Sequence, residues 1–232
     1  MHLEMKNLLF ITLVFIFGCK NQSSSKVSPE NLKLPIEAHM VVDNDVSFAE
    51  KFKPKNPDEP LEDTLFLKTT YGRFQIFPTG LLKTDKNDTI QLGTDLNIDK
   101  AYLYQDSTCI YIFFTDTDYE SSSSWIQKIN NNSFNNIYTE PIQGFNLGSP
   151  LIKQGKAFLT AMGYVAKLDL ESGKYDWAHP NLYDKTNESF NNFDSIVLRN
   201  GRVVFLSNNN LSGKTDSIIA DEATGEIIQI IK

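Results

Sequence analysis

Four segments of the chain repeat one order of strands and turns, and this repetition limits the possible folds more than any other feature. The segments begin at Thr64, Lys100, Ser149 and Ser195. In each, two apolar strands joined by a short turn precede a third strand that runs into a tight polar turn. No stretch shows a sustained helical stripe with caps. The repetition predicts an all-β fold built from similar units.

The first turn of the last two units carries a strong hairpin signal. Gln154-Gly155 and Asn200-Gly201 separate apolar runs at matching places, and two-residue turns of this kind need positive φ at both positions. The unit starts, between 36 and 49 residues apart, fit the period of four-stranded propeller blades. We therefore expect a β-propeller-like array of about four four-stranded blades, small or incomplete, with a fifth blade if residues 36–52 contribute strands.

The third unit contains the most specific local motif, AKLDLESGKYDW. Asp169 stands four residues before Gly173, with Ser172 between them and Trp177 closing the motif. An aspartate at this place accepts backbone N–H bonds across a turn, a hydroxyl supports it, and glycine adopts the left-handed conformation that other residues resist. We expect Trp177 to pack between neighbouring units.

The fourth unit repeats this motif as IADEATGEII. Asp221, Thr224 and Gly225 take the places of the aspartate, the hydroxyl residue and the glycine, while Gln229 replaces the tryptophan. The first two units lack the glycine and offer Asn87-Asp88 and Asn132-Ser133 instead. Because Asn and Asp tolerate left-handed backbone, the turn geometry is expected to survive there.

The two motif copies resemble the repeat of the pyrroloquinoline-quinone-like (PQQ-like) β-propeller family, broadly AxDxxTGKxxW. The resemblance implies that residues 36–232 form a PQQ-like β-propeller domain, and residues 149–180 carry it most directly. PQQ-dependent dehydrogenases, which share this repeat, have a vicinal disulfide that covers their cofactor. This chain has no adjacent cysteines, so that activity and its cofactor are not expected.

The start of the chain is similar to a bacterial lipoprotein signal. Leu8 to Phe17 forms an apolar core of about 10 residues, too short to span a bilayer, and Gly18 precedes Cys19. Residues 1–18 are expected to be removed as the signal, with Met5 favoured as the true start of translation, and the Cys19 thiol is expected to carry lipid. Several acyl chains on one residue would hold the protein at a membrane.

Residues 19–35 are expected to form the lipidated cysteine and a flexible tether. KNQSSSKVSPENLKLP contains three consecutive serines, two prolines and few large apolar side chains. No acidic cluster follows Cys19, and such clusters resemble the surface-export signals of some lipoproteins. We therefore expect the periplasmic face of the outer membrane, with the membrane engaged through Cys19.

Charge and cysteine content exclude several classes of function. The formal net charge is -7 and the lysines are scattered among acidic residues, so nucleic acid is not an expected partner. Once Cys19 is lipidated, Cys109 is the remaining thiol, and no intramolecular disulfide can form. Its apolar setting, STCIYIFF, favours a small buried side chain over a reactive one.

The sequence offers no convincing catalytic or metal-binding constellation. His39 and His179 lie outside any zinc-ligand or catalytic-triad spacing. Asp116, Asp118 and Glu120 alternate as calcium ligands do, but the glycine and distal glutamate of an EF-hand loop are missing. We expect no catalytic residue, no metal and no cofactor.

The expected function is that of a membrane-anchored, non-catalytic binding or assembly scaffold in the cell envelope, with a protein partner. Two alternatives stay open. One is a periplasmic immunity or inhibitor lipoprotein that neutralises a toxic enzyme, and the other is a degenerate propeller enzyme, which would need a pocket holding two suitably spaced carboxylates.

Overall fold

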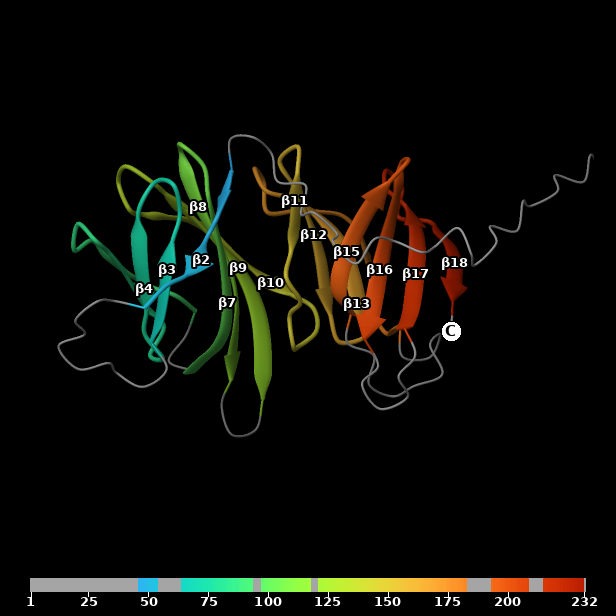
Figure 1. The fold of residues 1–232 in the computed structure, drawn as a ribbon, viewed down its shortest axis with the longest axis horizontal. Coiled ribbons are helices and arrows are strands. Elements are labelled where there is room, and N and C mark those ends of the chain that lie inside the picture. The colour runs from blue at the N-terminus through green and yellow to red at the C-terminus, as the bar shows by residue number, and fades with distance from the viewer. Residues whose placement is uncertain are drawn as a thin grey trace, which may run out of the picture. The chain divides into compact units, whose positions relative to one another are not determined.

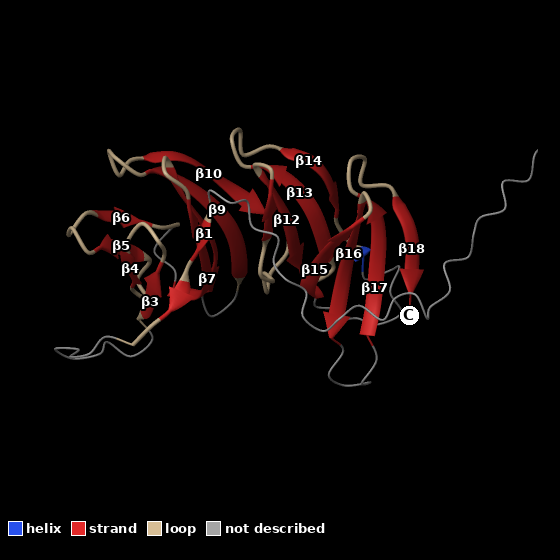
Figure 2. Ribbon diagram, turned by 45° about the horizontal axis from the view of Figure 1, so that its top comes forward, coloured by secondary structure: helices blue, strands red, loops and turns tan. Residues whose placement is uncertain are grey.

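The chain folds into β-strands that form four antiparallel sheets (Figures 1 and 2). The all-β class predicted from the sequence is confirmed. The computed structural model describes residues 46–53, 64–93, 97–117, 121–182, 193–208 and 215–231. All of them belong to one compact unit, residues 38–232. In this described part, no helix has the length and apolar character needed to cross a membrane.

The first and second sheets have five strands each. The first sheet has the order β2-β3-β4-β5-β6, with the bounds Glu50–Lys51, Leu65–Lys68, Arg73–Ile76, Leu81–Thr84 and Thr89–Gln91. The second sheet has the order β1-β7-β8-β9-β10, with the bounds Ser47–Phe48, Asn97–Gln105, Cys109–Thr117, Ser122–Asn130 and Asn136–Ile142.

The third and fourth sheets have four strands each, in chain order. The third sheet consists of β11 (Leu151–Lys153), β12 (Lys156–Ala161), β13 (Tyr164–Asp169) and β14 (Tyr175–His179). The fourth consists of β15 (Phe193–Arg199), β16 (Arg202–Asn208), β17 (Thr215–Asp221) and β18 (Ile227–Ile231). The four repeated segments of the sequence thus correspond to four sheets.

The described part of residues 36–52 joins existing sheets and adds no fifth one. Phe48 in β1 pairs with Tyr104 of the second sheet, and Glu50 in β2 pairs with Lys68 of the first. Between these two short strands, Ala49 donates its N–H to the carbonyl of Leu103 at 2.9 Å. This segment therefore connects the first sheet to the second.

The two hairpin turns singled out in the sequence have the predicted backbone. Gln154 and Gly155, between β11 and β12, have φ values of 51° and 68°. Asn200 and Gly201, between β15 and β16, have φ values of 51° and 71°. Positive φ at both central residues matches the right-handed twist of the flanking strands.

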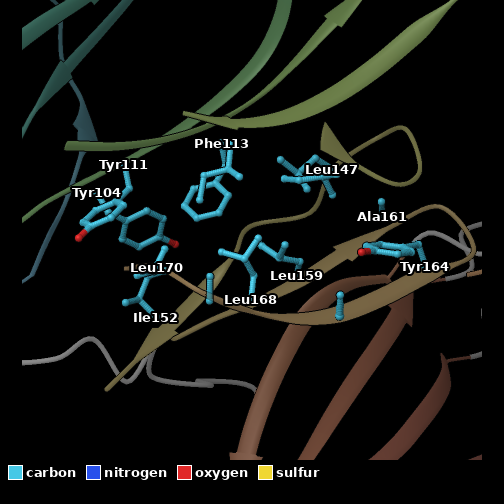
Figure 3. Close-up of a cluster of buried hydrophobic side chains, with 14 of the residues drawn as sticks. Tyr104, Tyr111, Phe113, Leu147, Ile152, Leu159, Ala161, Tyr164, Leu168 and Leu170 are labelled. Carbon is cyan, nitrogen blue, oxygen red and sulfur yellow. The ribbon is translucent and has the colours of Figure 1, made fainter. Parts of the chain in front are cut away.

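The hydrophobic core lies between successive sheets, because strands in the middle of the chain have apolar residues on both faces. In β12, Ala157 and Leu159 belong to a cluster shared with the second sheet, whereas Phe158 belongs to a cluster shared with the fourth. Figure 3 shows the former cluster, with Tyr111 and Phe113 of β8 pointing toward side chains of the third sheet. A further cluster joins the first and second sheets.

Candidate functional site

The tight turn of the third sheet closes around the carboxylate of Asp169. Its Oδ1 accepts hydrogen bonds from the backbone N–H of Ser172 at 2.7 Å and from the Ser172 hydroxyl at 2.8 Å. Gly173 has a φ of 72° and donates its N–H to the carbonyl of Asp169 at 2.9 Å. Three sequence-predicted residues therefore meet in one turn.

The turn of the fourth sheet has the same bonds. Oδ1 of Asp221 accepts from the N–H of Ala223 at 2.9 Å, and from the N–H and hydroxyl of Thr224 at 2.8 and 3.1 Å. Gly225 has a φ of 75° and donates to the carbonyl of Asp221 at 2.9 Å. An aspartate, a hydroxyl residue and a glycine thus produce the same local structure twice.

Hydrogen bonding stabilises the charged form of both aspartates. The Lys156 ammonium, 2.9 Å from Oδ2 of Asp169, and the donors of Ser172 hold the pKa of Asp169 well below its usual range. The backbone N–H and hydroxyl of Thr224 lower the pKa of Asp221. Asp169 in turn raises the pKa of Lys156, with help from Asp176. Both carboxylates already have partners, which makes them poor candidates for acid-base catalysis.

The second sheet builds this turn without aspartate or glycine. Oδ1 of Asn130 accepts from the N–H of Asn132 and of Ser133, each at 2.9 Å. Phe134 occupies the glycine position, with a φ of 53° and an N–H that donates to the carbonyl of Asn130 at 3.0 Å. Asn132-Ser133, the pair expected at the glycine position, lies just before it. Asn130 and Phe134 are four residues apart, as Asp169 and Gly173 are, and this spacing could have identified Phe134 as the residue at the glycine position.

The first sheet forms a shorter turn. Asn87 has a φ of 69°, so this expected pair, Asn87-Asp88, does supply the left-handed residue. The Thr84 hydroxyl accepts from the N–H groups of Lys86 and Asp88 at 3.2 and 3.1 Å. In this turn the hydroxyl of Thr84 accepts the backbone N–H bonds that an aspartate or asparagine side chain accepts in the later sheets.

Trp177 packs against the turn of the following sheet. A Cβ atom added to Gly225 would lie 2.5 Å from two atoms of the indole ring, so only glycine leaves room for it. The indole Nε1 donates to the carbonyl of Glu222 at 3.4 Å, and the ring contacts Phe205 edge-on at 6.2 Å between centroids. Trp177 therefore holds the third sheet to the fourth.

Tyr138 occupies the position of Trp177 in the second sheet and makes the equivalent contact with the third. Its ring would lie 3.0 Å from a Cβ added to Gly173, and its hydroxyl donates to the carbonyl of Leu170 at 2.9 Å. Burial between the sheets raises the pKa of the hydroxyl, which keeps it a donor. Tyr138 lies in the Asn-rich stretch NNNSFNNIY, whose aromatic residues the sequence favours as packing residues between units rather than as a recognition face, and Tyr138 packs in this way.

A lysine beside each of these rings reaches the same turn. Lys128, paired with Tyr138 across β9 and β10, places Nζ 2.7 Å from Oε2 of Glu171 and donates to the Glu171 carbonyl at 3.3 Å. Lys167, paired with Trp177, donates to the carbonyl of Glu222 at 3.0 Å. The two interfaces thus share a lysine, an aromatic ring and a turn glycine.

The fourth sheet does not carry this pair of groups forward. Ile219 and Gln229 pair across β17 and β18 at the places of Lys167 and Trp177. Ile219 has no cationic group and Gln229 has no aromatic ring, whereas the second and third sheets contact the following turn through a lysine and an aromatic residue. The fourth sheet therefore lacks both groups of the repeated interface.

The other sequence candidates lie apart from one another. Cys109 is buried, 7% exposed, and His179 has Nε2 2.6 Å from the carbonyl oxygen of Gly225. Cys19 and His39 lie outside the described residues. A search of the described ranges finds no group of three or more His, Cys, Asp or Glu side chains that could hold a metal ion.

Asp116 is a fully buried carboxylate in β8. Its Oδ1 accepts from the indole Nε1 of Trp125 at 3.0 Å, whereas its Oδ2 has no hydrogen-bond partner among the described residues. Asp118 and Glu120, the residues that could share a calcium ion with it, lie outside the described residues. Within the described part, Asp116 therefore has a structural contact with Trp125.

A hollow of about 630 Å³ on the first sheet is a candidate for binding. Its lining combines aromatic and cationic side chains with an amide, a hydroxyl and a carboxylate: Phe52, Lys53, Phe66, Lys68, Arg73, Phe74, Gln75, Thr84 and Asp85. The rings of Phe52 and Phe66 meet edge-on, 5.9 Å between centroids. The Arg73 guanidinium carbon lies 5.5 Å from the centroid of Phe52. Sequence reasoning missed this surface.

The comparisons with known proteins assign no family. No protein-family model matches the sequence, and a search of curated proteins finds no match. Among solved structures, the chain is similar to the crystal structure of the computationally designed Ika8 protein, with a TM-score of 0.35 and 8% identity. The alignment covers 75% of this chain and 72% of that one. A likeness of this size supports no inference about function.

Proposed function

We propose that the protein is a lipid-anchored, non-catalytic binding or assembly scaffold of the bacterial cell envelope. The observation that carries the proposal is what the polar and aromatic side chains in and beside the tight turns bind. Lys128, Lys167, Asp169, Asp221 and Trp177 all bind groups within the protein, mostly on the following sheet. A catalytic function would need charged or aromatic side chains of this kind to be free to contact a substrate. Their contacts instead stabilise the turns and the packing of one sheet on the next.

The finer fold assignment, a PQQ-like β-propeller-like array of about four blades, small or incomplete, belongs to this proposal. Two features support it. The tight turns of the third and fourth sheets have the hydrogen bonds expected of the family motif, and both receive an aromatic ring from the sheet before them. Ring packing between sheets is the role that the resemblance implies for the tryptophan.

The membrane anchor rests on the resemblance of residues 1–19 to a lipoprotein signal, with the periplasmic face of the outer membrane as the proposed location. A tethered body that presents a fixed surface suits a scaffold, because loops and faces on a rigid framework are common binding sites. The immunity or inhibitor alternative shares the anchor and the binding surface and differs in the partner. No contact in the described residues favours the degenerate enzyme.

Cell fractionation with Cys19→Ala tests the anchor. The wild-type protein is expected in the membrane fraction and Cys19→Ala in the soluble fraction. Cys109→Ala is the matched control, since it removes the other thiol, which is buried, and should leave the protein at the membrane. Cys19→Ala in the membrane fraction at the wild-type level would contradict the proposal.

In vivo photo-crosslinking tests the binding surface. A photoreactive residue at Lys68, in the hollow, is expected to capture a protein, whereas one at Lys174, exposed in the third-sheet turn, is the control. Equal capture at both positions would contradict a defined binding surface.

A further inference from the structure

We propose that the hollow on the first sheet binds an acidic segment of a partner protein, in which an aromatic side chain lies next to carboxylates. This inference rests on the proposed function, because it names the kind of partner that the scaffold holds. It follows from three observations on this face: its apolar floor, its cations, and its difference from the equivalent faces of the other sheets.

The floor of the hollow suits an aromatic or large aliphatic side chain. Phe52 and Phe66 meet edge-on, and Phe52, which directly follows β2, donates its N–H to the Phe66 carbonyl at 3.0 Å. A space of about 630 Å³ lies within the usual range of ligand sites. An inserted ring would pack against these two rings and lose contact with water.

The cations around this floor are available to carboxylates. Within the described ranges, Lys53, Lys68 and Arg73 form no ion pair, whereas the ion-paired cations, among them Lys128 and Lys156, belong to the second and third sheets. The chain as a whole is acidic, with a formal net charge of -7. Three cations around one hollow therefore do not reflect the average composition, and they are complementary to a negative ligand.

Arg73 contacts the aromatic floor and is also able to bind a carboxylate. Its guanidinium lies over the ring of Phe52, which limits its rotation while its N–H donors remain able to bind a carboxylate. Asp85 also lines the hollow, and its N–H donates to the Arg73 carbonyl at 3.1 Å. One acid beside three cations leaves the site positive.

The face differs from its counterparts in the other sheets. The residue directly before each tight turn is Ile129, Leu168 and Ala220 in the second to fourth sheets, and each is buried in the cluster shared with the preceding sheet. The first sheet has Lys83 there, paired with Gln75. This face has the composition of a solvated surface and not of a sheet-packing surface, so a soluble ligand can reach it.

Two other occupants are possible outcomes of the test. Anionic lipid headgroups could bind the same cations, and the chain's own Asp58, Glu59, Glu62 and Asp63 stand between Lys53 and Thr64 in the sequence. The aromatic floor favours the peptide over a headgroup, because a headgroup has no aromatic side chain to pack against Phe52 and Phe66.

The experiment measures binding of a fluorescein-labelled peptide, EEFEEFE, to the lipidated full-length protein in detergent micelles, by fluorescence anisotropy. Arg73→Gln with Lys68→Gln should weaken binding about tenfold or more, because charge-assisted bonds are lost. Lys174→Gln is the control and should bind as the wild type does. The peptides EESEESE and QQFQQFQ should both bind more weakly, and circular dichroism confirms that each variant is folded.

Four outcomes would overturn the proposal. The first is binding that Arg73→Gln with Lys68→Gln leaves unchanged, and the second is equal binding of EESEESE. The third is loss of binding to phosphatidylglycerol vesicles in the double variant without loss of peptide binding. The fourth is no binding to the wild type together with binding to a variant neutralised at Asp58, Glu59, Glu62 and Asp63. If photo-crosslinking at Lys68 but not at Lys174 captured a protein while one of these four results was obtained, the scaffold function would still be supported. Only the acidic, aromatic class of partner would then be rejected.

Discussion

The indole ring of Trp177 lies directly over Gly225, the turn glycine of the following sheet. A Cβ atom at Gly225 would lie 2.5 Å from two ring atoms, closer than real Cβ contacts come. The glycine also has a φ of 75°, which L side chains resist. Two independent physical reasons therefore select glycine here, and they can be separated by mutation.

Gly225→Ala is expected to lower the free energy of unfolding by about 3 kcal/mol, because it adds overpacking to backbone strain. Gly155→Ala is the matched control. Gly155 has a similar φ of 68°, but a Cβ there would meet no atom within 4 Å, so about 1–2 kcal/mol of strain is expected. Urea denaturation measures both. Equal losses of unfolding free energy in the two variants would show that the Trp177 ring moves aside at little cost, contrary to its proposed role in packing the third sheet on the fourth.

Tyr138→Phe is expected to cost about 1 kcal/mol of stability, because the mutation removes only the hydrogen bond to the Leu170 carbonyl. Tyr138→Ala should cost about 3 kcal/mol or more, since it also removes the ring that packs on Gly173. Thermal and urea unfolding of the two variants give the comparison. If the two variants were equally stable, the ring would not hold the second and third sheets together.

Asp169→Asn is expected to make the protein less sensitive to acid. The pKa of Asp169 is lowered in the folded state, so its charge stabilises the fold above its unfolded pKa, near 4, and this contribution is lost as the pH falls. Asparagine cannot titrate, yet it still accepts backbone N–H bonds, as Asn130 does in the second sheet.

The measurement is the free energy of unfolding between pH 7 and pH 2. Asp169→Asn should be less stable than the wild type at pH 7, because it loses its pairing with Lys156, and the gap should close toward pH 2. If the difference in stability between the two proteins grew as the pH fell, the pKa of Asp169 would not be lowered by folding. Asp176→Asn serves as a control that also contacts Lys156 but caps no turn.

Trp125→Phe is expected to destabilise the second sheet by about 1–3 kcal/mol through Asp116. The indole N–H is the described donor to this fully buried carboxylate, and a buried acceptor without a donor carries its full desolvation cost. Asp116→Asn in the Trp125→Phe background should recover part of the loss, because a neutral amide costs less to bury. An additive effect of the two mutations would mean that the contact is unimportant.

Local turn chemistry accounts for what the sequence predicted best. Gly155 and Gly201 adopt positive φ because a two-residue hairpin requires it, whatever surrounds the turn. The Asp169 turn is similar, since its bonds to Ser172 and Gly173 join residues only three or four positions apart. Patterns of this kind are visible in a short stretch of sequence.

The features that the sequence did not predict depend on contacts between sheets. Phe134 adopts a φ of 53° although it is not glycine, and its side chain packs against the cluster between the first and second sheets, which offsets the strain. Lys128 looks like an ordinary surface lysine in sequence, yet its side chain is only 3% exposed because the third sheet covers it. The hollow at Phe52 and Phe66 needs the pairing of β2 with β3 to exist.

Ile219 and Gln229 make the third and fourth sheets unequal as partners for an additional sheet. A unit duplicated from the third sheet and inserted before the fourth would carry Lys167 and Trp177, and the turn of Asp221 would already suit them. A unit added after the fourth sheet would meet Ile219 and Gln229 and find neither the cation nor the ring. An extra unit built into this protein is therefore expected to pack better between the third and fourth sheets than after the fourth.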